Sequence, residues 1–343
     1  MIVITPLSFC PHAFSIQQKN NPAARISVLD CPNSMTFRQP RHMDGQMSAA
    51  DAVSPTYPLS EHAIADARSI AVTIVASCQF APKIGAVGEN IAHGRTLIEQ
   101  AAERGARVVV LPELASSGYV FENTAEAAAA AVSPGGPELA PWRDASNHLG
   151  VVVVAGFCES GGAGKPFISA LILVPGNDPV VYRKVHLWDR ERLIFAAGSA
   201  PPPVVDTPIG RIAAMICYDL EFPEWVRIPA LEGADLICAP VNWPAGRRPP
   251  GERPGEVVRV QAQAAMNRVA IAVCDRTGTE RGVGWTSASV IVDADGWPKA
   301  LADAAVPGET ILSADIDLAD SRDKRIAEYS DVMADRRPDL YHP

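Results

Sequence analysis

The sequence lacks the features that mark several large classes of protein. No apolar run approaches the roughly 20 residues that a membrane-spanning helix needs. Its seven cysteines are scattered and show no C-x-x-C spacing, which favours a reducing compartment over a disulfide framework. Its seven histidines form no H-x-H or H-x-x-x-H pair, so we expect no metal site. With a net charge of -9, nucleic acids and anionic membranes are not expected partners.

The amino-terminal segment differs in composition from the rest of the chain. Residues 1–68 are rich in Pro, Ser, Asn and Gln and keep no helical or strand period, so we expect a disordered extension or a mis-assigned start. The first residues have no Lys or Arg before their apolar stretch and no clear small-residue cleavage site, which makes a poor signal peptide. Together with the cysteine pattern, this predicts a cytoplasmic protein.

Residues 69–318 show a regular alternation of strand-like and helix-like segments. Strands are expected at 71–80, 107–111, 151–157, 168–174, 180–187, 211–217, 235–241, 269–274, 287–296 and 310–317. Helices are expected at 89–104, 123–131, 137–149, 223–232 and 255–267. The alternation predicts one α/β domain whose sheets are covered by helices. Between 151 and 187 the strands follow one another without helices, which predicts a mixed sheet.

Two shorter segments, 161–166 and 319–343, give further structural predictions. GGAGKP at 161–166 superficially suggests a phosphate loop, but it lacks the first Gly and has Pro after Lys, so we expect a hairpin turn. The tail at 319–343 is expected to begin as a charged helix and to end extended. Such a tail is either disordered or packed on a partner subunit.

Reactive side chains follow or occupy several expected strands, and the carboxyl ends of strands are the usual place for active sites in α/β sheets. Glu113 comes just after the strand 107–111, where burial should raise the pKa of its carboxyl toward that of a general base. In YRKVHL, strand alternation places Lys184 on the opposite face from Arg183. A lysine on the inward face of a strand is costly unless it is paired, but it can stabilise an oxyanion. The alternatives are a capping or salt-bridged Glu113 and a surface Lys184.

Cys217 ends the expected strand 211–217, and a helix should begin about five residues later. A thiol at a strand-to-helix turn lies at the positive end of the helix dipole, which favours the nucleophilic thiolate. The alternative is a buried structural cysteine. A Cys–His hydrolase would pair Cys217 with His186 and orient the ring with Asp219, but no G-x-C-x-G elbow flanks the cysteine.

Together these motifs resemble those of the nitrilase superfamily, the carbon–nitrogen hydrolases, over residues 70–343. The resemblance rests on LPE with Glu113, YRKVHL with Lys184 and ICYDLEFPE with Cys217, in this order along the chain. WDRERLIFAAG resembles the segment of the family in which a glutamate precedes F-x-x-G, and it points to Glu191. GFCE and ADLICAPVNWP match further landmarks of the family.

The resemblance implies a four-layer αββα sandwich with no cofactor and no metal. It implies a small amide-type substrate and a homodimer or higher homo-oligomer, with residues 319–343 contributing to the interface. In the implied reaction, Cys217 attacks the substrate carbonyl and forms a thioester, while Glu113 moves the proton and later activates water.

The resemblance also implies the supporting roles in that reaction. Lys184 and the backbone N–H of Tyr218 would stabilise the oxyanion, and Glu191 would orient Lys184 or the substrate nitrogen. Tyr218 stands where true nitrilases usually have Trp, which favours an amidase that releases ammonia from a small carboxamide. Glu221 stands where the family member that acts on dicarboxylate monoamides typically carries Arg, so an anionic substrate is disfavoured. Equally, Glu221 could only cap the following helix.

Five side chains are candidates for lining the pocket, and each could instead pack in the core. They are His186, Glu221, Asn242, Trp243 and Trp285. His186 is more consistent with a satisfied histidine near the site or in the core. The remaining functional alternatives are an N-carbamoyl amidohydrolase or nitrilase with the same site, an acyltransferase, and a non-catalytic binding protein.

Overall fold

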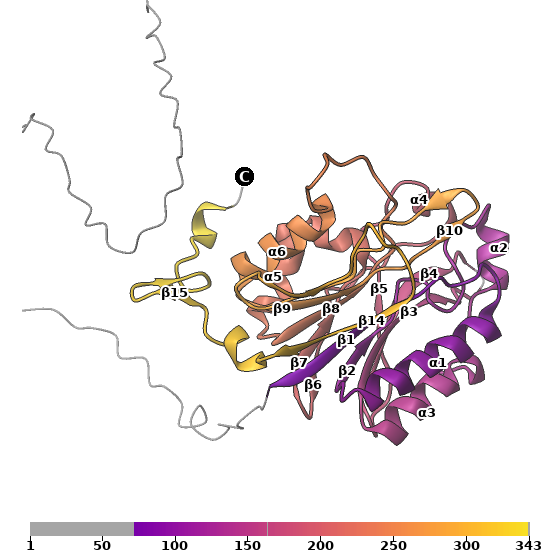
Figure 1. Cartoon of the computed structure of the whole chain (residues 1–343), viewed down its shortest axis with the longest axis horizontal. Coiled ribbons are helices and arrows are strands. Elements are labelled where there is room, and N and C mark those ends of the chain that lie inside the picture. Colours follow the sequence, from indigo (N-terminus) through magenta and orange to yellow (C-terminus); the bar gives the residue numbers. More distant parts are fainter. Residues whose placement is uncertain (1–71, 163, 342–343) are drawn as a thin grey trace, which may run out of the picture. The chain divides into compact units, whose positions relative to one another are not determined.

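The computed structural model describes residues 72–162 and 164–341. The extension or mis-assigned start expected at 1–68 lies outside the described residues. Two six-stranded sheets dominate the described part, with strand orders β14-β1-β2-β3-β4-β5 and β13-β12-β9-β8-β7-β6 (Figure 1). None of the described helices is long and apolar enough to cross a membrane.

The first sheet is mixed, as the sequence predicts. Its strands are β1 (Thr73–Gln79), β2 (Val108–Val110), β3 (Val152–Glu159), β4 (Phe167–Leu173), β5 (Val180–Arg183) and β14 (Thr310–Ile316). β1, β2 and β3 run parallel, while β4, β5 and β14 pair antiparallel with their neighbours. Because β3 and β4 form an antiparallel pair, the hairpin predicted at 161–166 is confirmed.

The second sheet carries the same arrangement of parallel centre and antiparallel edges. Its strands are β6 (Val204–Thr207), β7 (Gly210–Ala214), β8 (Leu236–Pro240), β9 (Ala270–Cys274), β12 (Val290–Val292) and β13 (Pro298–Leu301). β7, β8 and β9 are parallel, and β6, β12 and β13 are antiparallel. A separate short hairpin joins β10 (Thr279–Glu280) to β11 (Val283–Gly284).

Helices cover the outer faces of both sheets. The α-helices are α1 (Val87–Glu103), α2 (Thr124–Ala129), α3 (Ala140–Leu149), α4 (Glu191–Ile194), α5 (Pro223–Leu231) and α6 (Gly255–Asn267). α1 and α3 contact the first sheet, α6 contacts the second, and α5 packs beside α6 (Figure 1). Because β1 and β3 contact β9 and β8 across the middle, the layers are helix, sheet, sheet and helix. The predicted αββα sandwich is confirmed.

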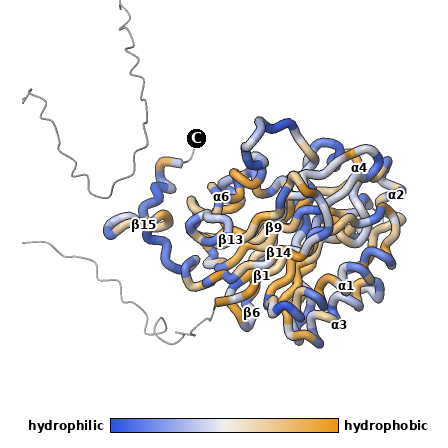
Figure 2. The backbone as a smooth tube through the Cα atoms, viewed as in Figure 1, coloured by the Kyte–Doolittle hydropathy of each residue, from blue (hydrophilic) through white to orange (hydrophobic). Residues whose placement is uncertain are grey.

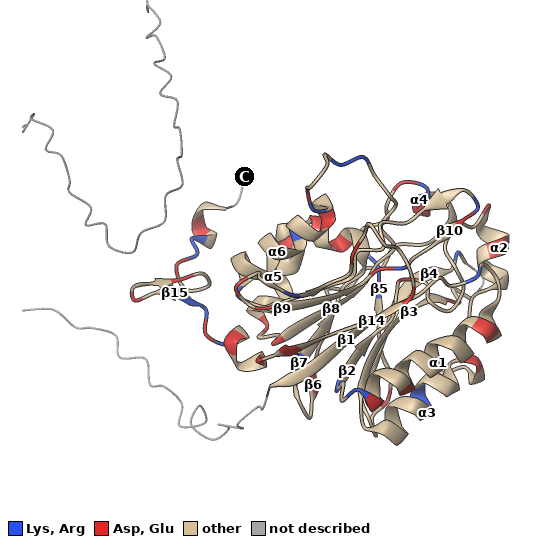
Figure 3. Ribbon diagram, viewed as in Figure 1, with Lys and Arg blue, Asp and Glu red and all other residues tan. Residues whose placement is uncertain are grey.

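Side-chain alternation assigns each strand residue to one of two cores. On β2, Val108 and Val110 belong to the core between the sheets, whereas Val109 faces the core beneath α1 and α3. Both faces of these central strands are therefore dry, which explains why they read as unbroken apolar runs. Figure 2 shows the strands as the hydrophobic interior, and Figure 3 shows most charges on helices and loops.

Several predicted elements are wrong in extent or type. The strand expected at 287–296 forms only β12, Val290–Val292. The strand expected at 180–187 ends at Arg183. Beyond it, the Lys184 carbonyl accepts a hydrogen bond from the Gly198 amide, and the His186 amide donates to the Asp219 carboxylate instead of to a neighbouring strand. The tail does not begin as a charged helix. It forms a 3₁₀ turn, Leu318–Ser321, and a hairpin of β15 (Arg325–Ala327) and β16 (Ser330–Asp331).

The tail departs from a helix because its Asp side chains bond nearby backbone amides, and its lysine finds a tertiary partner. The Asp317 carboxylate accepts from the Ala319 amide, and the Asp323 carboxylate accepts from the Arg325 amide. Lys324 Nζ donates to the carbonyls of Asn267 and Arg268 at the end of α6. These contacts attach the start of the tail to the second sheet's helical layer.

Candidate active site

Cys217 lies in a sharp turn between β7 and α5. The strand predicted at 211–217 ends at Ala214, and Cys217 begins a 3₁₀ turn, Cys217–Glu221, immediately before α5. Its φ of +49° is in the left-handed region that side chains other than glycine rarely adopt. The buried Asp219 carboxylate holds this turn by accepting from the Ile216 amide at 3.1 Å and the Tyr182 hydroxyl at 2.8 Å.

His186 packs behind this turn rather than beside the sulfur. Asp219 Oδ1 accepts the His186 amide and contacts its ring Nδ1 at 2.7 Å. The imidazole stacks on Phe222 with ring centroids 3.9 Å apart. Asp219 thus orients His186, as the Cys–His alternative requires, but in the described part of the chain no hydrogen bond joins His186 to Cys217. His186 is also not among the residues that line the cavity beside Cys217.

Lys184 lies between two carboxylates in the interior. Its Nζ is 2.8 Å from Glu113 Oε1 and 2.7 Å from Glu191 Oε1, and Lys184 and Glu113 have no solvent exposure. Glu191 begins α4, where its Oε2 accepts the Trp188 amide at 2.7 Å. The structure therefore brings Glu113, Lys184 and Glu191 together although they come from separate segments. A surface Lys184 and a capping Glu113 do not describe this arrangement, whereas the salt-bridged alternative for Glu113 does, because Glu113 pairs with Lys184.

Asn242 joins Glu113 to Cys217 through its side chain and its backbone. Its Nδ2 donates to the Glu113 carbonyl at 2.8 Å, and its own carbonyl accepts from Cys217 Sγ at 3.8 Å. Oε2 of Glu113 accepts no hydrogen bond from the described residues. Cys217 is close enough to lower the Glu113 pKa, so this carboxylate oxygen is available to the thiol.

Burial and the neighbouring charges together set the protonation states of the three central groups. It raises the pKa of Glu113 to about 7, against the opposing effect of Lys184. Burial also opposes the charge of Lys184, but Glu113 and Glu191 outweigh it, and the Lys184 pKa is raised. For Cys217, burial and then Glu113 raise the pKa well above its usual value. The expected dipole-stabilised thiolate is thus not the resting state, and the thiol needs a base.

A cavity of about 420 Å³ opens beside Cys217. Four other predicted residues line it, namely Tyr218, Glu221, Asn242 and Trp243. A second cavity of about 210 Å³ is lined by Glu191 and Trp285 and shares Tyr119, Trp188 and Pro244 with the first. The sequence reasoning missed Tyr119, which follows LPE by six residues, and Trp188, which directly follows YRKVHL.

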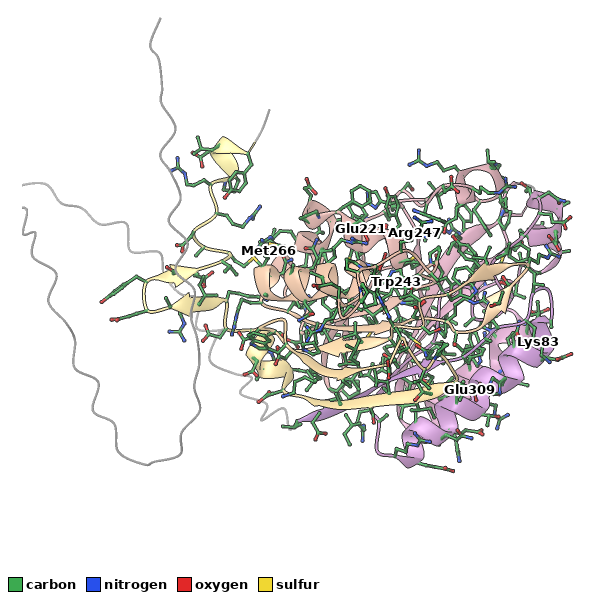
Figure 4. All side chains as sticks on the ribbon, turned by 45° about the horizontal axis from the view of Figure 1, so that its top comes forward. Lys83, Glu221, Trp243, Arg247, Met266 and Glu309 are labelled. Atoms are coloured by element: carbon green, nitrogen blue, oxygen red, sulfur yellow. The ribbon has the colours of Figure 1, made fainter. Side chains whose placement is uncertain are left out.

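A charged cluster forms part of the wall of the larger cavity. Arg259 Nε donates to Glu221 at 2.7 Å, and its Nη2 donates to Glu256 at 3.2 Å. Glu221 does not cap α5, because no side chain caps that helix. Two carboxylates around one guanidinium leave this wall with one net negative charge. Figure 4 labels Glu221 and Trp243, which come from separate segments, the turn before α5 and the segment after β8.

No group of three or more His, Cys, Asp or Glu side chains could hold a metal ion among residues 72–162 and 164–341. The four other cysteines of this part, Cys78, Cys158, Cys238 and Cys274, are buried in strands. Cys217 differs from them in its left-handed backbone and its place in the cavity wall.

Comparisons with known proteins point to one family. Residues 74–326 match the family described as carbon-nitrogen hydrolase. A nitrilase of Pyrococcus abyssi is 35% identical over 270 residues, covering 78% of this chain and 98% of its own. A citrullinase of Francisella tularensis is 31% identical over 265 residues, covering 74% and 91%. A solved variant of the amidase from Nesterenkonia sp. AN1 is 25% identical with a TM-score of 0.62, covering 75% and 95%, and it carries the acetamide moiety of fluoroacetamide on its active-site cysteine.

Proposed function

The chain belongs to the carbon–nitrogen hydrolase family, and from this premise we propose that it releases ammonia from a small carboxamide through a thioester on Cys217. It is an amidohydrolase with a cysteine nucleophile. The observation that carries the assignment of residues is the buried ion triad of Glu113, Lys184 and Glu191 beside Cys217. A lysine buried between two carboxylates has a large desolvation cost and is retained where its charge has a use.

In the proposed first half-reaction, Glu113 Oε2 takes the proton of the Cys217 thiol as Sγ attacks the substrate carbonyl carbon. The carbonyl π bond becomes an oxyanion, which Lys184 Nζ and the backbone N–H of Tyr218 stabilise. The tetrahedral intermediate collapses as Glu113 returns the proton to the leaving nitrogen. Ammonia departs, and the acyl group remains on Cys217 as a thioester.

The second half-reaction uses the same base. Glu113 takes a proton from water as the oxygen attacks the thioester carbonyl, and the second tetrahedral intermediate expels the Cys217 sulfur, which regains that proton. The carboxylic acid is released, and the thiol is restored. Throughout, Glu191 keeps Lys184 charged and in place, because it retains an ion pair with Lys184 when Glu113 is protonated.

The cavity wall supports a neutral or cationic carboxamide over a monoamide of a dicarboxylic acid. Glu221 and Glu256 share one guanidinium, that of Arg259, so an anionic substrate would meet net like charge. The name of the citrullinase relative favours a second candidate, hydrolysis of an N-carbamoyl compound by the same groups.

The test is ammonia release from a panel of neutral, cationic and anionic carboxamides, N-carbamoyl compounds and nitriles, comparing the wild type with Cys217→Ala. Ammonia release from carboxamides by the wild type, but not by Cys217→Ala, supports the proposal. Release only from carbamoyl compounds or nitriles replaces the substrate class but keeps the site. If a folded wild type releases nothing, the assay is repeated with an amine acceptor. An amide product then assigns an acyltransferase, and its absence a non-catalytic binding protein.

We also propose that the protein works in the cytoplasm as a homodimer whose interface includes the tail. The support is that the five described cysteines are free, and that Ile326 and Tyr329 of the tail hairpin are 62% and 88% exposed. Apolar side chains at the tip of a short hairpin are more stable against a second subunit than in water.

A further inference from the structure

Tyr119 shares a carboxylate oxygen with Lys184. Its hydroxyl donates to Glu191 Oε1 at 2.6 Å, and Lys184 Nζ donates to the same oxygen at 2.7 Å. With the Trp188 amide on Oε2, Glu191 accepts three hydrogen bonds from three directions. The Tyr119 ring lines both cavities, so the tyrosine connects the substrate-facing wall to the ion triad.

A distant carboxylate holds the turn that presents Tyr119. Glu280 Oε2, from the β10 hairpin, accepts the backbone amides of Tyr119 at 2.9 Å and Val120 at 2.6 Å. Gly118 permits this approach, since its φ is +76° and a Cβ there would lie 2.7 Å from Glu280 Oε1. Glu280 is only 6% exposed. The turn is thus fixed by a carboxylate 161 residues away in sequence.

Arg276 holds Glu280 in turn. Its Nη2 donates to Glu280 Oε1 at 3.1 Å and to the Pro82 carbonyl at 3.0 Å. Its guanidinium lies 4.6 Å from the centre of the Trp285 ring, and Trp285 contacts Tyr119 edge-on at 5.2 Å. Arg276 is 1% exposed, and its Nε and Nη1 have no hydrogen-bond partner among the described residues.

A buried, incompletely bonded arginine is a poor stabiliser of a fold. Replacing a buried ion pair by packed apolar side chains is often neutral or stabilising, so stability alone does not account for this one. The Arg276–Glu280 pair instead fixes the geometry of a turn, because Glu280 accepts the backbone amides of two successive residues, Tyr119 and Val120.

We propose that Glu280, oriented by Arg276, is a positioning residue for the hydrolysis: it sets the Tyr119 hydroxyl against Glu191 and thereby keeps Lys184 between its two carboxylates. The inference rests on the proposed function, since it takes the roles of Lys184 and Glu113 from it. Glu280 acts only through Tyr119 and Glu191 and does not touch the substrate.

The mechanism makes the acid limb of the pH profile a sensitive readout. Burial and then Glu191 raise the Tyr119 pKa, so the hydroxyl remains a donor. Without that donor, Glu191 draws Lys184 more strongly, and Glu113 loses part of the cation that lowers its pKa. The charged and titratable groups that act on Glu113 are Lys184, Glu191, Cys217, Tyr119 and Arg276. The acid limb should therefore move to higher pH.

The test is a double-mutant cycle on the full chain with Tyr119→Phe, Glu280→Gln and the double variant. Two readouts are measured against pH, kcat/KM for the best amide and the rate of Cys217 alkylation by iodoacetamide. We expect each single variant to lose about tenfold in kcat/KM, the value of one hydrogen bond, and the double variant to lose no more than the worse single. The acid limb of both pH profiles should move to higher pH in all three variants.

Asp235→Asn is the matched control. Asp235 is also a buried carboxylate, 1% exposed, that accepts a backbone amide, from Arg211, and is bonded by an arginine, Arg322, away from the cavity. It should lower the thermal midpoint and leave both pH profiles unchanged. If Glu280→Gln does not fold, Arg276→Lys replaces it, because it keeps the cation but loses the guanidinium geometry.

Additive losses in the double variant, or a changed thermal midpoint with wild-type pH profiles, would overturn the proposal and leave Glu280 structural. The alkylation readout separates this failure from that of the proposed function. If no amide is cleaved but the acid limb of the Cys217 alkylation profile moves to higher pH in Tyr119→Phe and Glu280→Gln, the positioning role is supported and the substrate assignment is contradicted.

Discussion

At the scale of single residues, the environment of Glu113 determines what its carboxyl can do. An exposed glutamate titrates near pH 4.5, whereas burial raises the Glu113 pKa to about 7, despite the neighbouring Lys184. The same burial raises the Cys217 pKa, so at neutral pH a protonated thiol faces a carboxyl group that is partly ionised. Burial thus makes Glu113 a stronger base than an exposed glutamate, and the raised pKa of the Cys217 thiol makes such a base necessary.

The first prediction concerns the pH profile. Glu113 must be ionised to accept the thiol proton, so kcat/KM should fall as pH drops below about 7 and not near 4.5. Initial rates across pH 5 to 9 measure this limb, and Glu113→Gln should lose about 10²–10⁴-fold of the rate. A limb that stays near 4.5 would contradict the assignment of Glu113 as the base.

The second prediction separates the cost of removing Lys184 from that of removing Cys217. Lys184→Met leaves two buried carboxylates without a cation, so it should destabilise the fold by about 3–5 kcal/mol as well as abolish turnover. Cys217→Ala removes one sulfur atom and should cost about 1 kcal/mol with equal loss of turnover. Urea unfolding at pH 7.5 measures both. Equal stability losses would show that the triad is not energetically coupled.

The third prediction concerns charge in the cavity. Glu221→Arg should shift the ratio of kcat/KM for anionic over cationic carboxamides upward by about tenfold or more, because it reverses a charge beside Arg259. Glu224→Arg is the control, since it makes the same charge change on the exposed first turn of α5. A similar shift in both variants would mean that the whole-molecule field, and not the cavity wall, selects the substrate.

At the scale of elements, small residues allow strands to pass close to the catalytic turns. Gly156 of β3 lies beneath the Glu113 turn, where a Cβ would be 2.3 Å from the Pro112 carbonyl oxygen and 2.5 Å from Glu113 Cα. Gly198 plays the same part beside Lys184, with its Cβ position 2.2 Å from the Arg183 carbonyl. These two glycines stand in the GFCE and F-x-x-G landmarks that helped to identify the family.

The fourth prediction follows from that approach. Gly156→Ala must push the Glu113 backbone away, which should lower kcat by at least about tenfold and destabilise the fold by about 1–3 kcal/mol. Gly88→Ala is the control, because a Cβ at Gly88 meets nothing within 4 Å. Stopped assays and thermal unfolding of both variants measure the effect. Wild-type kcat in Gly156→Ala would show that the position of Glu113 tolerates the shift.

At the scale of the whole molecule, the described part of the tail exposes four large apolar side chains, Ile326, Tyr329, Leu340 and Tyr341. Its start is attached by Lys324 to α6, while Ile326 and Tyr329 extend from the hairpin into solvent. The fifth prediction is that the double substitution Ile326→Asp and Tyr329→Asp converts a dimer into a monomer. Light scattering after gel filtration measures the mass. An unchanged mass would contradict a role for the tail in assembly, and a monomeric wild type would contradict the homodimer.

Much of this protein followed from the sequence because strand and helix periods record burial that is local to each segment. The apolar runs predicted most of the longer strands, and the motifs around Glu113, Lys184, Glu191 and Cys217 predicted a family whose membership the comparisons confirm. Short edge strands such as β6 and β13 escaped, because a four-residue strand with one face in solvent has little period to detect. The tail escaped because its partners lie on α6, far away in sequence.

What only the tertiary structure decided was which groups share an oxygen and which lie in a dry environment. Nothing in the order of residues says that Tyr119 and Lys184 both donate to Glu191, or that Glu280 holds the turn of Tyr119 across 161 positions. The pKa of Cys217 likewise moved opposite to the expectation from its helix dipole. A dipole is a local property that sequence can anticipate, whereas desolvation is the sum of everything that the fold packs around the sulfur.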